Sequence, residues 1–159
     1  MTRKAAPHMD GTSAPGAATV RQQILDEIAA RATPPPPYVV RLSLGVRALE
    51  WRPGFVAVTF HIPDDLCVEP GIAFGGHVAG LHDQAAGFAM YSVLEDDLVF
   101  ATTRLDVGYL AVTRPGDVRL EARVAAADDR SAEVRVSLTQ AGRVTSESVV
   151  TEAIRKAKK

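Results

Sequence analysis

The chain has 159 residues, of which 47% are hydrophobic, and its formal net charge is -1 at pH 7. This length fits one ordinary domain, and the hydrophobic content is enough for a packed core, so disorder throughout the chain is excluded. The charge gives no reason to expect a nucleic acid or an anionic membrane as partner, although a negatively charged small ligand needs only a local patch.

The single cysteine, Cys67, cannot form a disulfide within the chain, so a reducing compartment fits best. No apolar run approaches the length that spans a bilayer. The first residues include Arg3 and Lys4 without an apolar stretch behind them, which is unlike a signal peptide. We therefore expect a cytoplasmic protein.

Residues 1–18 are rich in Ala, Gly, Pro, Ser and Thr, and we expect a disordered tail there. Residues 19–37 predict an N-terminal helix and a proline-rich spacer. Apolar residues recur at helical spacing after Thr19, which suits an N-cap, and four prolines end the helix. This helix is expected to pack on the outside of the main domain.

After the prolines the apolar period changes to two. Residues 38–51 and 55–62 predict two strands, and the Arg-Pro-Gly turn between them makes a hairpin. An irregular stretch follows. Residues 76–94 are then apolar almost all round, which is typical of a buried helix.

Four more segments have strand character, and short turns between them predict an antiparallel meander. They cover roughly 98–112, 118–127, 131–141 and 143–154. Residues 156–159 read as a basic tail. One buried helix must be covered by one sheet, so we expect an α+β fold in which a curved antiparallel sheet wraps around a central helix.

Asp83 is the residue of the buried helix that most needs an explanation. It stands in mid-helix among apolar residues, and burying a carboxylate without a partner costs several kcal/mol, on the order of a domain's whole stability. A structural Asp, bonded to a loop or to a histidine, is one explanation, and a catalytic carboxylate is the other. The spacing alone weighs them about evenly.

Small residues form a stripe on the helix near Asp83. Glycine in a helix interior costs up to about 1 kcal/mol relative to alanine, which indicates a close approach to the backbone. Packing by the sheet or a second subunit would explain the stripe, and so would a channel for a thin ligand such as an acyl-pantetheine arm. The stripe consists of Gly76, Ala79, Gly80, Ala86 and Gly87.

Phe74, Gly75 and Gly76 open the buried helix. The first backbone N–H groups of a helix have no partner within it, and the helix dipole places partial positive charge there. Glycines let a substrate carbonyl come near these groups. The pattern therefore indicates an oxyanion hole for acyl transfer, with a carboxylate two turns later.

These residues resemble the hot-dog thioesterases, in the branch of the phenylacetate-pathway and human thioesterase-superfamily enzymes. That branch starts its central helix with His-Gly-Gly and places an Asp seven residues after the second Gly, which is the spacing of Gly76 and Asp83. The run TTRLDVGYL at 102–110, followed by Pro-Gly-Asp at 115–117, is also similar. The resemblance covers about residues 42–154 and implies a hot-dog acyl-CoA thioesterase domain at 38–155.

The resemblance also implies roles. In that family the Asp is general base or nucleophile at the thioester carbonyl, the first Gly N–H polarises that carbonyl, and a Ser or Thr on the next strand helps to place water. By position these roles fall to Asp83, Gly75 and Thr102. Strand parity places Thr103 on the face of the following apolar residues, and a local bulge would exchange the two threonines, so Thr103 is a substrate-binding candidate.

Two positions depart from the family pattern. Phe74 replaces the His of His-Gly-Gly, and Val68 stands six residues earlier, where many members have Asn. Phe-Gly-Gly also occurs in related hot-dog thioesterases, so hydrolysis is still expected. Two apolar side chains here suit a larger, apolar acyl group. The remaining candidates for substrate contact are Gly76, His77 and Gly80.

No metal and no cofactor are expected. His77 and His82 are five residues apart and do not share one face with Asp83, and no third ligand has metal-site spacing. The expected partners are a small-molecule acyl-CoA and further copies of the chain. Hot-dog units commonly pair edge to edge with active sites across the pairing, which implies a homodimer or homotetramer.

Two other functions stay open. A non-catalytic acyl-CoA-binding hot-dog protein is favoured by the residues at positions 68 and 74. A hot-dog hydratase or dehydratase would need a His with an Asp or Glu near the helix. His82 follows Leu81 and precedes Asp83, so it points to a different side of the helix, which makes this function the weaker alternative.

Overall fold

The computed structural model describes residues 17–30 and 45–157, and the statements below refer to these residues. Most of the predicted disordered tail, the proline-rich spacer, the start of the first strand and the last two residues of the basic tail lie outside them. Within the described ranges, neither helix is long and apolar enough to cross a membrane.

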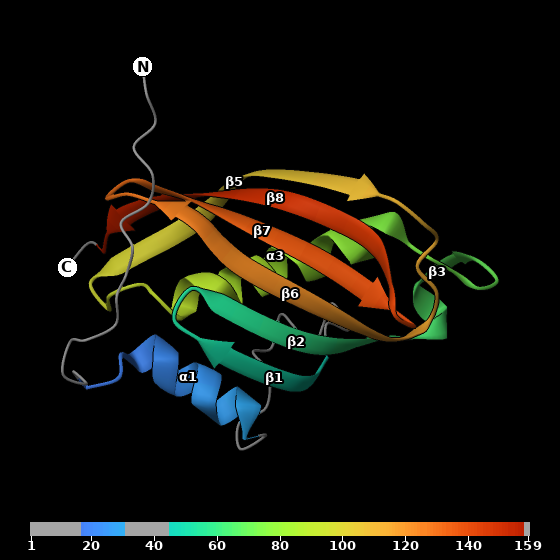
Figure 1. The fold of residues 1–159 in the computed structure, drawn as a ribbon, viewed down its shortest axis with the longest axis horizontal. Helices are drawn as coiled ribbons and strands as arrows, with labels where there is room; N and C mark the ends of the chain where they lie inside the picture. Colours follow the sequence, from blue (N-terminus) through green and yellow to red (C-terminus); the bar gives the residue numbers. More distant parts are fainter. Residues whose placement is uncertain (1–16, 31–44, 158–159) are drawn as a thin grey trace.

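One antiparallel sheet arches over one central helix, which confirms the predicted α+β hot-dog architecture (Figure 1). The helix is α3, Gly75–Tyr91. In spatial order the strands are β1 Val46–Arg52, β2 Phe55–Ile62, β6 Gly116–Ala127, β7 Ser131–Gln140, β8 Arg143–Lys156 and β5 Leu98–Tyr109. The link from β2 to α3 contains the 3₁₀ turn Asp64–Leu66 and the short hairpin of β3 Cys67–Glu69 and β4 Ile72–Ala73.

Hydrophobic burial explains why this sheet curves around this helix. Alternate residues of the strands point inward onto α3, while α3 is itself apolar on most sides. Burying an apolar side chain of this size stabilises the fold by roughly 1.5–3 kcal/mol. The largest completely buried apolar side chains are Leu25, Phe60, Ile62, Leu81, Met90, Leu120 and Leu138.

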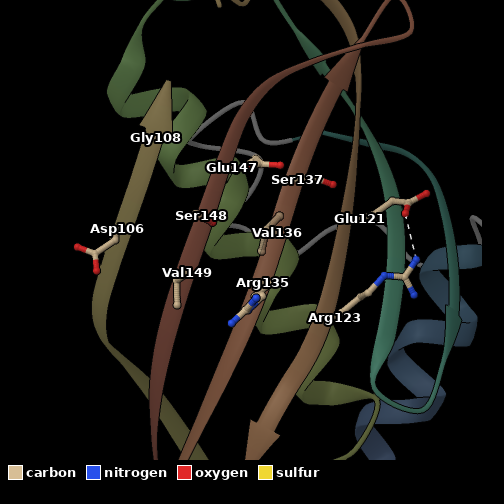
Figure 2. A pocket seen from close by; sticks show the side chains of 10 residues that line it. All are labelled: Asp106, Gly108, Glu121, Arg123, Arg135, Val136, Ser137, Glu147, Ser148 and Val149. Carbon is tan, nitrogen blue, oxygen red and sulfur yellow. Dashed lines mark hydrogen bonds and ion pairs between the residues drawn. The ribbon is translucent and has the colours of Figure 1, made fainter. Parts of the chain in front are cut away.

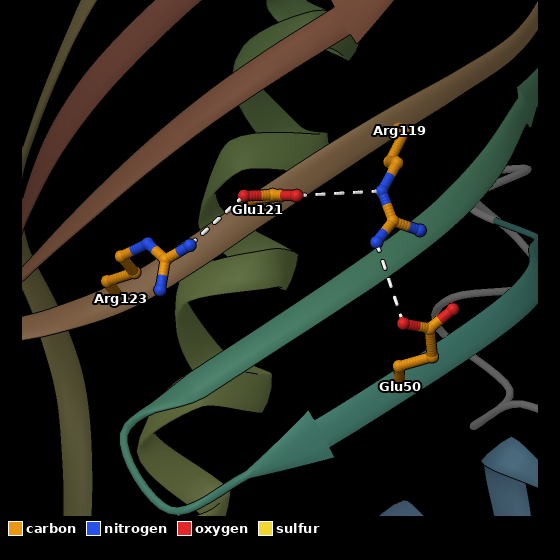
Figure 3. Close-up of polar contacts among 4 residues, drawn as sticks. All are labelled: Glu50, Arg119, Glu121 and Arg123. Atoms are coloured by element: carbon orange, nitrogen blue, oxygen red, sulfur yellow. Dashed lines mark hydrogen bonds and ion pairs between the residues drawn. The ribbon is translucent and has the colours of Figure 1, made fainter.

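The outward-facing residues of the strands are polar and pair with one another across the sheet. On β6, Glu121 lies between Arg119 and Arg123, at 3.7 and 3.3 Å (Figure 3). Arg119 also reaches Glu50 on β1 at 3.6 Å. Exposed pairs of this kind each contribute little to stability, so they mark the solvent side of the sheet rather than hold it together.

The strand order differs from the predicted meander at one place. β6, β7 and β8 are consecutive neighbours as predicted, but β5 pairs with β8 at the sheet edge, and β6 pairs with β2. The segment after β5, which includes Arg114 and Pro115, is therefore a crossover rather than a hairpin turn. This arrangement gives the free edge of the β1–β2 hairpin a partner and lets a single sheet cover α3.

The predicted N-terminal helix is present as α1, Val20–Ala29, with Thr19 as its N-cap. Thr19 and Gln22 form a reciprocal capping box, which satisfies two of the free N–H groups at the helix start. Leu25 and Ile28 are buried, and the Trp51 indole N–H donates to Asp26 Oδ1 at 2.8 Å. The helix thus packs on the outside of the domain beside β1 (Figure 1).

Candidate active site

Asp83 lies on α3 with one carboxylate oxygen bonded to Thr102 of β5. Thr102 Oγ1 donates to Asp83 Oδ1 at 2.7 Å. The register of β5 against β8 shifts between Thr102 and Arg104, so a bulge falls at Thr103. The structure therefore brings Thr102 to Asp83, whereas Thr103 donates to the Thr151 carbonyl at 3.1 Å.

A second carboxyl group, which the sequence reasoning missed, lies behind this pair. Glu152 on β8 pairs directly with Thr102 across the strands, and Thr102 Oγ1 lies 3.3 Å from Glu152 Oε1. Glu152 is completely buried, and burial raises its pKa. The signal was present in the sequence, because position 152 shares its strand parity with the buried Val150 and Ile154.

The first backbone N–H groups of α3 are available to bind a ligand. No acceptor for the N–H of Gly75 or Gly76 occurs among the described residues, as expected for the first turn of a helix. Tyr109 at the end of β5 donates its hydroxyl to the Gly75 carbonyl at 2.7 Å. The ring of Phe74 lies over Gly76 so closely that a Cβ there would be 2.7 Å from it, so residue 76 must be glycine for this ring position.

Two depressions meet beside this helix start. One of about 370 Å³ is lined by Gly75, Val78 and Tyr109. A second, of about 770 Å³, is lined by Arg114 and Arg143. The two share the segment 111–112, so together they form a continuous concave surface that runs outward from the N-terminus of α3.

Gly75 and Asp83 do not meet within one chain. They are eight residues apart on the same straight helix, which at 1.5 Å per residue separates them by about 12 Å along its axis. Neither Asp83 nor Thr102 lines the depression beside Gly75. A single chain thus holds two halves of the expected site at two places, the open N–H groups at one and the carboxylate with its threonine at the other.

The other predicted substrate-binding residues surround the helix start or face outward from it. Val68 and Phe74 are 60% and 53% exposed, so two large apolar side chains are presented at the surface near Gly75. A Cβ at Gly80 would meet no atom within 4 Å, which leaves the helix backbone open there. His77 is buried, its Nε2 has no partner among the described residues, and burial lowers its pKa.

His82 points to a different part of the sheet from Asp83, towards the middle of β8. Its side chain is completely buried, with Nδ1 2.8 Å from Ser148 Oγ and Nε2 2.7 Å from Ser146 Oγ. These two serines interrupt the apolar alternation of β8 because they bind this histidine. Burial lowers the pKa of His82 to about 4, so the ring is neutral near pH 7. Among the described residues, no group of three potential ligands could hold a metal ion.

A further depression, of about 470 Å³, lies on the outer face of the sheet (Figure 2). Its charged residues come from four strands and include Asp106, Arg123, Arg135 and Glu147, with α3 behind the sheet. Figure 2 also shows Glu121 and Arg123 paired within it. This mixed-charge surface is separated from Asp83 by the sheet, so it is not part of the candidate site.

The comparisons agree with this architecture. Residues 70–147 match the family model of the thioesterase superfamily. The fold is similar to that of a phenylacetic acid degradation-related protein from Ralstonia eutropha JMP134, with a TM-score of 0.69 and 21% identity, covering 81% of this chain and 98% of that one. No curated protein sequence matches the chain.

Two further solved structures are similar. The conserved protein PA5202 from Pseudomonas aeruginosa has a TM-score of 0.70 and 25% identity, with 79% of this chain and 99% of that chain covered. The protein smu.793 from Streptococcus mutans UA159, solved with bound acetyl-CoA, has a TM-score of 0.65 and 21% identity, with 72% and 92% covered.

A curved antiparallel sheet around one central helix, with open N–H groups at the helix start and a carboxylate further along it, defines a protein of the hot-dog class. The family match covers α3, β5, β6, β7 and the start of β8. Residues 70–147 thus match the thioesterase superfamily, the family that the sequence motifs resemble.

Proposed function

We propose that the chain is an acyl-CoA thioesterase that hydrolyses a fatty or aromatic acyl-CoA to a free acid and coenzyme A. The observation that carries this proposal is the Asp83 carboxylate, which receives a 2.7 Å hydrogen bond from Thr102 while its second oxygen has no partner among the described residues. The acetyl-CoA bound by the similar Streptococcus mutans protein supports a CoA thioester as the substrate class.

Asp83 is suited to act on the thioester carbonyl in either of two ways. As a general base it would take a proton from water while the water oxygen attacks the carbonyl. As a nucleophile it would form an acyl anhydride that water then hydrolyses. In both, the Gly75 N–H and the helix dipole would stabilise the developing oxyanion, and the sulfur of coenzyme A would leave and take up a proton. No cofactor is needed for either route.

The two halves of the site require two chains. Because Gly75 and Asp83 lie about 12 Å apart on one helix, we infer a homodimer in which Gly75 of one chain and Asp83 of the other act on the same thioester. β5 supports such pairing, since it is a 12-residue strand at the sheet edge with most residues exposed. A two-fold axis would run α3 antiparallel to its copy and make two equivalent sites.

Mixed dimers test this arrangement directly. Asp83→Asn removes the carboxylate, and Gly75→Pro removes only one N–H, at the helix position where proline is best tolerated. Phe74 already has φ -62° and ψ 123°, which suits a residue before proline. Each variant alone is expected to be inactive, but a dimer of one chain of each kind regains one intact site. Mixed dimers that stay as inactive as their parents would show that the site does not combine the two chains.

The larger depression suits the phosphates of coenzyme A. Arg104, Arg119, Arg123 and Arg135 each pair with a carboxylate. Within the described part of the chain, no carboxylate pairs with Arg114 or Arg143, although Arg114 donates to the Gly71 carbonyl at 3.2 Å. Both arginines border the surface that leads to Gly75 and are therefore candidates to bind the nucleotide end, as a bidentate donor binds phosphate.

Replacing these arginines should affect only substrates that carry the nucleotide. Arg114→Gln and Arg143→Gln are expected to raise KM for acyl-CoA with little change for the same acyl group on N-acetylcysteamine. Arg135→Gln on the outer face is the matched control. Equal effects on both substrates would argue against phosphate binding.

Release of free coenzyme A from short, medium, long and aromatic acyl-CoAs is the first test of the function itself. Hydrolysis by the wild type, lost in Asp83→Asn with the same oligomer, would support the proposal and identify the acyl class. Binding without turnover would favour the non-catalytic alternative. Val68 and Phe74, which replace the Asn and His of the family pattern, would then explain the lack of hydrolysis. The hydratase alternative is disfavoured because His82 is completely buried and bonded to two serines.

A further inference from the structure

The Thr102 hydroxyl lies between two carboxyl groups and has one hydrogen to give. Its Oγ1 is 2.7 Å from Asp83 Oδ1 and 3.3 Å from Glu152 Oε1. If both carboxyl groups were ionised, both could only accept, and one of the two contacts would have no hydrogen between its oxygens. A neutral carboxylic acid at one side resolves this conflict, because it brings a second hydrogen.

Glu152 is the group that its surroundings keep neutral. Its side chain is completely buried, and Oε2 has no hydrogen-bond partner among the described residues. Burial raises the pKa of Glu152, the Thr102 hydrogen bond lowers it by less, and the charge of Asp83 raises it further. Asp83, in contrast, is only partly buried and holds the shorter of the two contacts with Thr102.

The elements packed around Glu152 bring one charged group to it. That group is Asp83 on α3, while the residues paired with Glu152 on β5 and β7 are Thr102 and Ala132. His82 on α3 is bonded to serines further along β8. No arginine or lysine in the described ranges forms an ion pair with Glu152, so no cation offsets an ionised form.

We propose that Glu152 is a positioning residue that, as a neutral acid, donates its hydrogen to Thr102 Oγ1, so that Thr102 donates its own to Asp83 Oδ1. With the hydrogen bonds in this direction, the Thr102 hydroxyl always donates to Asp83 Oδ1. Asp83 Oδ2 is then left to act on water or substrate. No covalent bond changes in this resting arrangement. Its importance for turnover rests on the proposed thioesterase function, whereas the order of the hydrogens does not.

An infrared titration tests the protonation without any assay of activity. The wild type at pH 7 is expected to show the carbonyl band of a neutral carboxylic acid. Glu152→Gln should lose that band, and Glu147→Gln, on the exposed side of the same strand, should keep it. In Asp83→Asn the band's midpoint should move to lower pH, because the neighbouring negative charge is gone. A wild type without the band, or a midpoint unmoved in Asp83→Asn, overturns the proposal.

Kinetics then test the positioning role. The amide of Glu152→Gln can still donate to Thr102 at any pH, so kcat/KM should stay within about threefold of wild type and lose the decline that ionisation of Glu152 causes at higher pH. Glu152→Met fills similar space without a donor, and kcat should fall roughly tenfold with KM little changed. Equal losses in both variants overturn the role. A correct infrared titration in a protein that hydrolyses no thioester would instead refute the proposed function alone.

Discussion

His82 makes the folded protein sensitive to acid, and the size of the effect can be worked out. In the unfolded chain the ring titrates near its ordinary pKa of 6.5, whereas burial lowers the pKa in the folded protein to about 4. Between these values the unfolded state binds more protons, so stability is fully present above pH 6.5 and is lost as pH falls towards 4. The full loss is about 3 kcal/mol, of which about 2 kcal/mol should be lost at pH 5.

Guanidinium unfolding at a series of pH values measures this loss. Wild type and His82→Gln are compared between pH 7.5 and 4.5, because glutamine does not titrate. Glu152 contributes with the opposite sign, because its raised pKa lowers stability as pH rises above about 4.5, but this contribution is common to both proteins and cancels in the comparison.

The variant should therefore lose about 2 kcal/mol less than the wild type between pH 7 and pH 5. Parallel curves for wild type and His82→Gln would refute the reasoning, because they would mean that the buried ring accepts a proton as readily as an exposed one.

Three more predictions concern packing and the helix start. Phe60→Ala, in the completely buried core, should lower the free energy of unfolding by about 3–5 kcal/mol in guanidinium titrations. Gly76→Ala should leave stability within about 1 kcal/mol, because the exposed Phe74 ring can swing away from the new methyl, while turnover falls as the ring moves. Tyr109→Phe should change stability by less than about 1 kcal/mol, because the bond to the Gly75 carbonyl is exposed, yet lower kcat/KM several-fold.

Local sequence patterns predicted most elements because their physical causes are local. The period of two in 55–62 and the all-round apolar character of 76–94 depend only on which side chains face a core. The position of β5 could not be predicted in this way. The alternation of apolar and polar residues in β5 would be the same whether β5 paired with β6 or with β8. The sequence pattern therefore does not determine the strand order, in which β6 pairs with β2 and β5 with β8.

The polar residues of the last strand show a different limit. Ser146, Ser148 and Glu152 each occupy an inward-facing position, so alternation alone reads them as defects. Each is explained by a partner far away in the sequence: the two serines bind His82, and Glu152 meets Thr102. A buried polar side chain needs such a partner, but the sequence does not say which residue supplies it. The bulge that turns Thr102 towards Asp83 depends in the same way on pairing with β8.

The candidate site shows why a sequence motif gives an incomplete picture. Sequence spacing predicted that Gly75 and Asp83 act together, and both residues lie on α3. On a rigid helix, however, that spacing keeps the N–H group and the carboxylate about 12 Å apart, too far to act on one carbonyl. The same spacing becomes useful when two helices run antiparallel, because each Gly75 then faces the region of its partner's Asp83. In such a dimer, the spacing along α3 that separates Gly75 from Asp83 within one chain would bring Gly75 of one chain close to Asp83 of the other.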